Sequence, residues 1–344
     1  MNTVIALDVG HSAVKVVADT PSGRHQFIFP SVASLAIELS EPGARESAAR
    51  ETVNVDGKKF FFGQTAVAQG TPDAESGMNE NWITAPEYSA LVLGAFLKLE
   101  QMPERISHEG AIVVVGLPSK FFSQQRPILS AIMKKLAPNS KILVLPQPLG
   151  PFNCIQLDAD GKESTNHNMS NEAWGVIEIG HYTTDFGVVR EGSWIDKNSG
   201  SCPGGHVMVE RVVALIKEQR GYTLPLVEAT KAIAHGSFKD FGNQVPIAPF
   251  VSQAATHLIT VVMNKANQLL DADARTLDGI VVAGGGASII YPAIAAKYPH
   301  AVIAAGDPRM TVAEGFCRFG CAARNDMKIR AERLAKPAAT NAAA

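Results

Sequence analysis

The sequence contains few cysteines, little net charge and no long hydrophobic run. Its four cysteines show no Cys-x-x-Cys spacing, which argues against a zinc site and against a disulfide framework. A formal net charge of −2 at pH 7 gives no general basic character to attract nucleic acid directly. No apolar run is long enough to span a bilayer, and the N-terminus enters a predicted strand without a signal-peptide pattern. We therefore expect a cytoplasmic protein with no membrane segment and no direct contact with nucleic acid.

The composition is typical of a folded globular protein. Hydrophobic residues make up 46% of the 344 positions and charged residues 19%, which is unlike a disordered chain. A single hydrophobic core rarely serves a chain of this length. We therefore expect two lobes, each of which buries its own apolar surface.

The stretch from Val176 to Val188 predicts a β-hairpin with a polar tip. A buried strand leads to Gly180, where the missing Cβ allows a ligand to approach the backbone N–H groups. Thr183 adds a hydroxyl, and Asp185 adds a carboxylate that could hold a metal ion or orient a water. Taken alone, the pattern is explained more simply as a tight turn with ordinary polar residues.

A similar pattern occurs near the N-terminus. Between Val4 and Val17 an apolar strand is followed by Asp8, Gly10 and Ser12, and a second apolar strand begins around Lys15. The two hairpins lie about half a chain apart. They predict two similar lobes that face one polar, anionic ligand.

The remaining segments favour an α/β fold with an inserted region of short strands. The stretch 39–51 is polar without a clear period and indicates a surface loop. In the first half, the apolar residues within 24–33 predict a strand that Pro30 ends, and a hairpin follows over 53–63. We also expect a helix after Pro86, and buried strands over 111–115 and 141–145 on either side of a helix over 124–136. In the second half we expect a helix over 207–219, a short mixed region over 224–249, a helix over 251–270, buried strands over 279–283 and 301–305, a helix over 312–324 and a frayed tail.

Two further segments are candidates for a binding site. Gln147 follows a predicted buried strand, and α/β sheets usually bind ligands at the carboxyl ends of their strands. The alternative for Gln147 is a solvated turn residue. Gly284 to Gly286 follow another buried strand, where the backbone could lie against a planar or phosphorylated ligand. Glycines are common in loops, so this run alone is weak support.

Together these segments resemble the superfamily of actin, heat-shock chaperone and sugar kinase ATPases. The resemblance rests on four motifs in order: Asp8 with Gly10, Pro146 to Leu149, Glu178 to Asp185, and Ala283 to Gly286. Finer details resemble the ParM/StbA branch of plasmid-segregating bacterial actins. These are Phe29-Pro30-Ser31, Phe61 to Ala66, Gly116-Leu117-Pro118, and Asp307-Pro308 followed by Ala313 to Phe316.

The resemblance implies a two-lobed actin-like ATPase fold of the α/β class. Each lobe would be a ribonuclease-H-like subdomain with a smaller inserted subdomain. The first lobe would cover residues 1–165 with an insert at about 25–85, and the second would cover 166–330 with an insert at about 222–250. Residues 331–344 would form a flexible tail.

The resemblance also implies that ATP or ADP binds with Mg²⁺ in the cleft between the lobes. Asp8, Glu178 and Asp185 would face the metal, and Gln147 would position the attacking water. Gln147, Glu178 and Asp185 are thus the implied catalytic residues. Nucleotide contacts are implied for Asp8, Gly10, His11, Ser12, Lys15, Gly180, His181, Tyr182, Thr183, Gly205, Lys217, Gly284, Gly285 and Gly286. Among these, Lys217 would touch the base or ribose.

The chain departs from the family pattern at three places. Glu178 stands where the family nearly always has Asp, so the metal geometry is left open. His11 replaces a common Ser or Thr, and His181 with Tyr182 replaces small residues at the second hairpin tip. The two histidines could add positive charge below about pH 6.5. Alternatively they point away from the phosphates.

The implied function is an ATPase that polymerises head to tail into dynamic filaments and segregates plasmid DNA. The DNA would be held through a DNA-binding adaptor protein on a centromere-like site, which fits the near-neutral charge. One alternative is a small-molecule kinase, but no convincing catalytic Asp is found near residues 85–120. Another is a cell-division or pilus actin-like adaptor, but the alanine-rich stretch after Lys336 lacks a bulky apolar face for a membrane.

Overall fold

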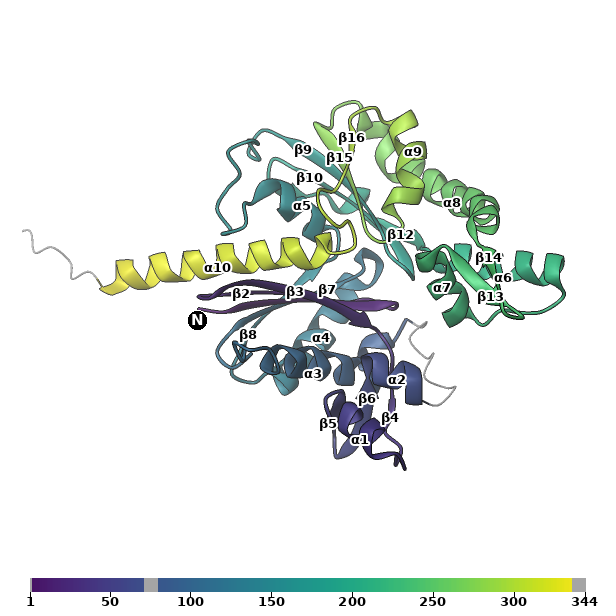
Figure 1. Cartoon of the computed structure of the whole chain (residues 1–344). Coiled ribbons are helices and arrows are strands. Elements are labelled where there is room, and N and C mark those ends of the chain that lie inside the picture. Colours follow the sequence, from purple (N-terminus) through teal and green to yellow (C-terminus); the bar gives the residue numbers. More distant parts are fainter. Residues whose placement is uncertain (1, 71–79, 336–344) are drawn as a thin grey trace, which may run out of the picture.

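Two similar β-sheets dominate the structure, a computed structural model that describes residues 2–70 and 80–335 (Figure 1). The first sheet has the order β3-β2-β1-β7-β8, and the second has the order β11-β10-β9-β15-β16 with β12 beside β10. The strands of the first sheet are β1 (Val4–Val9), β2 (Ala13–Thr20), β3 (Gly23–Pro30), β7 (Ile112–Leu117) and β8 (Lys141–Pro146). Those of the second are β9 (Ala173–Ile179), β10 (Thr183–Arg190), β11 (Ser193–Trp194), β12 (Gly200–Pro203), β15 (Gly279–Ala283) and β16 (Ala301–Ile303). The predicted α/β fold with two lobes is confirmed.

The two predicted hairpins occupy the same position in the two sheets. β1 pairs with β2 antiparallel and with β7 parallel, and β9 pairs with β10 antiparallel and with β15 parallel. The register places Asp8 opposite Lys15 in the first hairpin and Glu178 opposite Asp185 in the second. Directly opposed side chains share one face of a sheet, so each tip carries its polar pair on one side.

Helices cover both faces of the first sheet because its central strands are apolar on both sides. Leu7 belongs to the core under α3 (Pro86–Glu100) and α4 (Phe122–Leu136). Its neighbour Ala6 points to the opposite face and packs with α10 (Thr311–Ala335). Thus α10, from the end of the chain, completes the core of the first lobe.

The second sheet is covered in the same way. Its main core contains residues of α6 (His206–Arg220), α8 (Ala248–Ala274) and α9 (Ala287–Lys297). The other face packs against Phe152 of α5 (Leu149–Gln156). The structure therefore differs from the predicted lobe limits: α5 lies on the second sheet and α10 on the first, so the chain crosses between the lobes twice.

Each lobe carries a smaller insert. In the first lobe it consists of β4 (Ala33–Leu35), α1 (Pro42–Ala49), β5 (Thr52–Val55), β6 (Lys58–Phe62) and α2 (Gly63–Gln69). In the second it consists of α7 (Leu226–His235), β13 (Ser237–Asp240) and β14 (Asn243–Pro246). Short 3₁₀ helices are η2 (Trp82–Thr84), η3 (Ser119–Phe121) and η4 (Asp196–Asn198). The predicted first insert of 25–85 began too early, because residues 25–30 pair with β2 in the main sheet.

The loop predicted over 39–51 was wrong, because α1 forms within it. Glu41 caps this helix: its carboxylate accepts hydrogen bonds from the N–H groups of Gly43, at 2.8 Å, and of Ala44. Pro42 occupies the first turn, where its missing N–H costs nothing. Only Ala48 is buried, so the segment shows almost no helical hydrophobic period.

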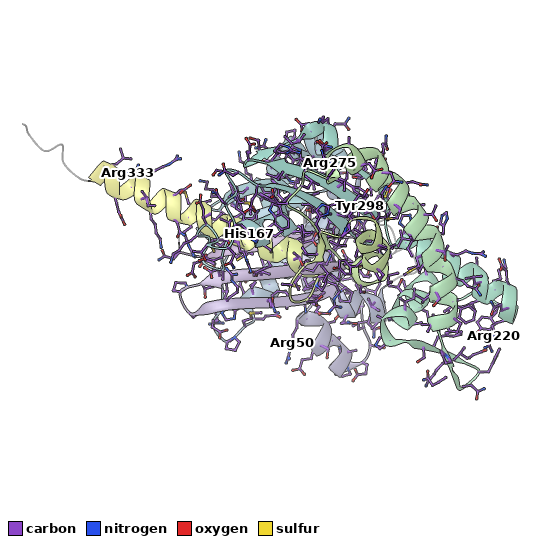
Figure 2. The ribbon with its side chains drawn as sticks, turned by 90° about the horizontal axis from the view of Figure 1, so that it is seen from above. Arg50, His167, Arg220, Arg275, Tyr298 and Arg333 are labelled. Carbon is purple, nitrogen blue, oxygen red and sulfur yellow. The ribbon has the colours of Figure 1, made fainter. Side chains whose placement is uncertain are left out.

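The terminal helix is longer than predicted. α10 continues past Arg324 to Ala335, so the first five residues of the predicted tail are helical and 336–344 lie outside the described residues. Near Arg333 the helix extends beyond the body of the molecule (Figure 2). Within residues 2–70 and 80–335, no helix has the length and apolar character needed to cross a membrane.

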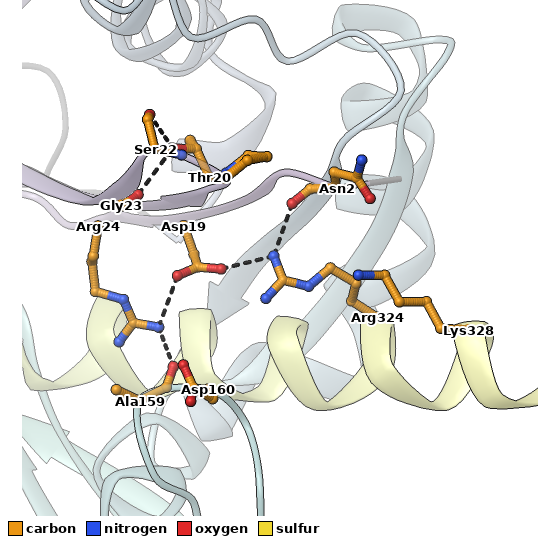
Figure 3. A pocket seen from close by; sticks show the side chains of 11 residues that line it. Asn2, Asp19, Thr20, Ser22, Gly23, Arg24, Ala159, Asp160, Arg324 and Lys328 are labelled. Carbon is orange, nitrogen blue, oxygen red and sulfur yellow. Dashed lines mark hydrogen bonds and ion pairs between the residues drawn. The ribbon is translucent and has the colours of Figure 1, made fainter.

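Ion pairs fasten α10 to the edge of the first sheet. Asp19 of β2 lies 2.7 Å from Arg324 and 3.6 Å from Arg24 of β3 (Figure 3). Arg24 also contacts Glu314 of α10 at 2.6 Å. These side chains border a surface pocket of about 730 Å³ that contains none of the predicted site residues. The pocket therefore belongs to the attachment of α10.

Candidate functional site

The two hairpin tips face each other across a cleft between the lobes. The cleft wall combines predicted residues from both tips with the end of β8. The first lobe contributes Asp8, Gly10, His11, Ser12, Lys15 and Gln147, and the second contributes Glu178, Gly180, His181, Tyr182 and Thr183. Residues that are far apart in the sequence are therefore brought into one site.

Asp8 is the centre of a polar chain in the first lobe. It is 3% exposed, accepts a hydrogen bond of 2.9 Å from Nζ of Lys15 through Oδ2, and accepts one of 3.1 Å from Nε2 of Gln147 through Oδ1. Burial lowers the pKa of Lys15, but the charge and hydrogen bond of Asp8 outweigh it, so the pKa lies above its usual value. Lys15 is therefore a charged ammonium group at the cleft wall.

Glu178 brings a second carboxyl group to the same site from the other lobe. It is 6% exposed, and its pKa is raised well above the usual range by burial first and by the carboxylates of Asp8 and Asp185 next. Lys15 partly offsets this rise. A bound cation would reverse it, because positive charge favours the ionised form.

The tip of the second hairpin is held by the loop that precedes α6. The carbonyl groups of residues 180–182 all accept hydrogen bonds from the N–H groups of residues 204–206. The bonds join Gly205 to Gly180 (2.9 Å), His206 to His181 (2.8 Å) and Gly204 to Tyr182 (2.9 Å). In a planar trans peptide the N–H points opposite to the C=O, so the N–H groups of His181 and Tyr182 face away from this loop. Gly205 thus positions the tip, although it does not line the cleft.

Asp185 lies behind the cleft wall. Its carboxylate accepts hydrogen bonds from the N–H of Ser119 (2.6 Å), the hydroxyl of Ser201 (2.7 Å) and the hydroxyl of Thr183 (2.6 Å). Burial raises its pKa, and these hydrogen bonds lower it in part. Because Ser119 belongs to the first lobe, Asp185 joins the lobes.

Within residues 2–70 and 80–335 no group of three or more His, Cys, Asp or Glu side chains is arranged to hold a metal ion.

The predicted glycine run, residues 284–286, lies beside Glu178 but does not line the cleft. Gly284 has a positive φ of 89°, and a Cβ there would lie 2.6 Å from Oε1 of Glu178 and 2.4 Å from the carbonyl oxygen of Ile179. The N–H of Gly286 donates to that same carbonyl at 3.1 Å. A Cβ at Gly285 would meet only the Cγ of Arg309, at 3.8 Å, so there is open space beside Gly285.

Lys217 is exposed on α6 and does not line the cleft. Sequence reasoning missed Arg309, whose positive charge acts on Lys15 and which pairs with Asp307 at 2.7 Å. Only the Asp307-Pro308 turn marked this segment in the sequence. It also missed Trp82, which lines the cleft from η2, and no local pattern pointed to it.

The histidines at the two tips take part in aromatic contacts. The His11 ring lies 4.5 Å from that of Tyr182 and 5.7 Å from that of Trp82, between centroids. Burial first, and then the charges of His181, His206 and Lys15, lower the pKa of His11 to about 3. Burial also lowers the pKa of His181 to about 4. Both rings are therefore neutral near neutral pH.

The cleft thus offers a cation, two carboxyl groups, an amide and backbone N–H groups in one place. Backbone N–H groups and an ammonium ion bind phosphate oxygens, and carboxylates bind the hard cation that accompanies them. The arrangement suits a polyphosphate with its divalent metal ion.

Comparisons with known proteins match two parts of the chain to protein families. Residues 6–150 match the family model of the N-terminal domain of actin like proteins, and residues 176–296 match that of the archaeal actin homologue MreB-like, C-terminal. No curated protein sequence matches the chain.

Several solved structures share the fold over nearly their full length. A 15-stranded ParM filament from Clostridium botulinum is 21% identical with a TM-score of 0.72, covering 93% of this chain and 99% of that one. An archaeal actin homologue in complex with ADP is 17% identical with a TM-score of 0.65, covering 94% and 100%. MreB 5 of Spiroplasma citri bound to AMPPNP is 15% identical with a TM-score of 0.64, covering 96% and 99%. By its two family matches and this shared architecture, the chain belongs to the actin-like proteins and has the fold of ParM.

Proposed function

We propose that the protein binds ATP with Mg²⁺ between its hairpin tips, hydrolyses it slowly, and polymerises head to tail into dynamic filaments. The main observation in support of this proposal is that Asp8, Lys15 and Gln147 of the first lobe line the same cleft as Glu178 of the second lobe. No single lobe contains the complete site. Nucleotide binding is therefore linked to the relative position of the lobes, as a filament switch requires.

The phosphates would be held from both sides. Lys15 offers a positive charge, and the N–H groups of His181 and Tyr182 face away from the loop that binds their carbonyls. Gly10 leaves room in the first tip, where a Cβ would already lie 3.0 Å from Nζ of Lys15. Donors fixed in advance bind developing negative charge without rearrangement.

Asp8 and Glu178 are the carboxyl groups that could face the metal ion, directly or through its waters. Bound there, Mg²⁺ would neutralise phosphate charge and act as a Lewis acid. Asp185 would act indirectly, because its carboxylate already accepts three hydrogen bonds. This narrows the role that the family resemblance implied for Asp185.

Gln147 would orient the attacking water. Its Nε2 is used in the hydrogen bond to Asp8, which leaves the amide oxygen to accept a hydrogen bond from water. An amide can orient water but cannot remove its proton at neutral pH. Hydrolysis should therefore be slow, as suits a filament whose lifetime depends on it.

Filament formation would follow from contacts between different faces of successive copies. Such heterologous contacts produce open polymers when their rotation does not close into a ring. The ParM structure from Clostridium botulinum is a filament, which supports the same behaviour here. Plasmid segregation in the cytoplasm, through a DNA-binding adaptor on a centromere-like site, is the cellular role that we propose for it.

Fluorescent ATP binding and phosphate release, each with magnesium or with excess chelator, test the nucleotide site. We expect tight binding and slow phosphate release with magnesium, and loss of both in Lys15→Gln. Lys231→Ala, an exposed lysine on α7, is the matched control and should behave as wild type. Absence of nucleotide binding by the wild-type protein would contradict the proposal.

A further inference from the structure

Four aromatic rings form a continuous column across the cleft. Trp82 lies 5.7 Å from His11, His11 lies 4.5 Å from Tyr182, and Tyr182 lies 5.5 Å from His206, between ring centroids. These spacings are those of aromatic pairs in contact.

Only one junction in the column connects the lobes. Trp82 and His11 belong to the first lobe, whereas Tyr182 and His206 belong to the second. Trp82 is 5% exposed and meets the ring of Tyr88 edge-on at 6.0 Å. Each half is therefore anchored in its own lobe, and the lobes meet at His11 and Tyr182.

The anchor in the second lobe is polar. The backbone N–H of His206 donates to the carbonyl of His181 at 2.8 Å, and its Nδ1 lies 3.1 Å from that oxygen. His206 is thus fixed to the hairpin tip on which Tyr182 stands. We therefore expect the hairpin tip and the rings of Tyr182 and His206 to move as one unit.

A second contact between the lobes lies behind the cleft. There Ser119 donates to Asp185 at 2.6 Å, and the N–H of Lys120 donates to the hydroxyl of Ser201 at 3.3 Å. Asp185 lies only three residues from Tyr182, so this contact and the ring contact both join the lobes beside the tip of the second hairpin. Separation of the hairpin tips must break the ring contact between His11 and Tyr182.

We infer that His11 and Tyr182 form a latch between the lobes, which a nucleotide must open to enter or to leave the cleft. The inference rests on the proposed function in that the ligand is a nucleotide. Nε2 of His11 is buried without a hydrogen-bond partner in the described part of the chain, so ring packing rather than polar bonding holds this side chain. The column is a positioning device and sets the rate of nucleotide exchange.

The expected effect follows from the strength of one aromatic pair. Such a pair contributes about 1 kcal/mol beyond the burial of its area, which corresponds to about a fivefold change in a rate. Removing the latch lowers the barrier to opening in both directions. Association and dissociation should therefore both become faster, while their ratio changes much less.

Stopped-flow kinetics with a mant-labelled ATP and magnesium test the latch. We expect His11→Ser and Tyr182→Ser each to raise both rate constants about three- to tenfold. The double variant should add little, because either substitution alone breaks the same contact. His257→Ser, on the exposed face of α8, is the matched control and should keep wild-type rates.

Two further measurements separate a latch from a general structural role. His11→Phe keeps an aromatic ring and should restore slow exchange. The fluorescence of Trp82, identified by comparison with Trp82→Phe, should change when nucleotide binds wild type and change much less in His11→Ser.

The outcomes distinguish the latch from the proposed function. If wild type binds no nucleotide, the proposed function fails and the inference fails with it. If wild type binds but the variants leave both rates unchanged, only the latch is contradicted. Faster dissociation with unchanged association would also contradict it, because the rings would then contact the nucleotide directly.

Discussion

Nε2 of Gln147 donates a hydrogen bond of 3.1 Å to Oδ1 of Asp8, and the other carboxylate oxygen of Asp8 accepts one from Lys15. One carboxylate thus fixes both the amide that could orient water and the ammonium that could bind phosphate. The amide oxygen of Gln147 takes no part in this bond. Its position, rather than its basicity, is what it can contribute to hydrolysis.

Replacing Gln147 with Ala should slow hydrolysis while assembly persists. The loss should be about 100-fold, the lower range for a group that assists proton transfer or positions a reactant. Phosphate release and pelleting, measured on the same sample, check this. Because the Asp8 and Lys15 pair remains, nucleotide-dependent pelleting should still occur. If pelleting is lost as well, Gln147 has a structural role.

Replacing Asp185 with Ala should weaken the fold as well as abolish hydrolysis. It would leave the donors of Ser119, Thr183 and Ser201 without their acceptor, at about 1–3 kcal/mol for each one that water cannot reach. Asp185→Asn keeps an acceptor oxygen and should destabilise less. Urea unfolding measures the difference, with exposed Asp196→Ala as the control. Wild-type stability in Asp185→Ala would contradict the assignment of Asp185 to the contact between the lobes.

The half-buried histidines of the two tips should make the fold sensitive to mild acid. The pKa values of His11 and His181 in the folded protein are about 3 and about 4, below the value of 6.5 for an unperturbed histidine. Between these limits the unfolded chain binds more protons, so stability falls as pH decreases. Each histidine contributes up to about 1.4 kcal/mol per pH unit below about pH 6.5.

Urea unfolding at several pH values from about 7.5 to about 5.5 measures this dependence. The double variant His11→Asn with His181→Asn should show a shallower loss of stability than wild type. His257→Asn removes an exposed histidine and should leave the slope unchanged. Equal slopes in the double variant and wild type would show that neither histidine is held neutral by the fold.

Adjacent glycines in the 284–286 loop should respond differently to alanine. Gly284→Ala should destabilise the protein by about 2 kcal/mol or more, because its φ is positive and a Cβ would contact Ile179 and Glu178. Gly285→Ala has open space and should stay within about 0.5 kcal/mol of wild type. If this loop contacts the nucleotide, as the family resemblance implies, Gly285→Ala should nevertheless weaken ATP binding. Thermal unfolding and nucleotide titration separate the two effects.

The main sheets and hairpins could be predicted because their signals are local. Apolar strands with Asp8 and Gly10, or Glu178 and Gly180, between them define a hairpin within about fifteen residues. α1 escaped prediction because only Ala48 is buried, so it lacks an apolar stripe. Its start was nevertheless marked by Glu41 and Pro42. The full length of α10 could not be predicted either, because its last turns are exposed and therefore lack an apolar pattern.

The site could be predicted only in part because several of its contacts join segments that are far apart in the sequence. The tips themselves carry recognisable residues, and the structure brings them together. The ring column requires Trp82 and His206, which lie far from both tips in the sequence. Asp185 was predicted to face the metal because its spacing matches a family motif. Spacing does not reveal that Ser119, from the other lobe, already binds that carboxylate.

Light scattering at 90°, with parallel pelleting, tests the central claim most directly. Purified protein is mixed with magnesium and ATP, ADP or a non-hydrolysable ATP analogue over a range of concentrations. The account predicts a threshold concentration, a rise in scattering with ATP, a decay as phosphate is released, and stable polymer with the analogue. ATP binding without scattering or pelleting under any of these conditions would contradict the assignment of this protein as a dynamic filament.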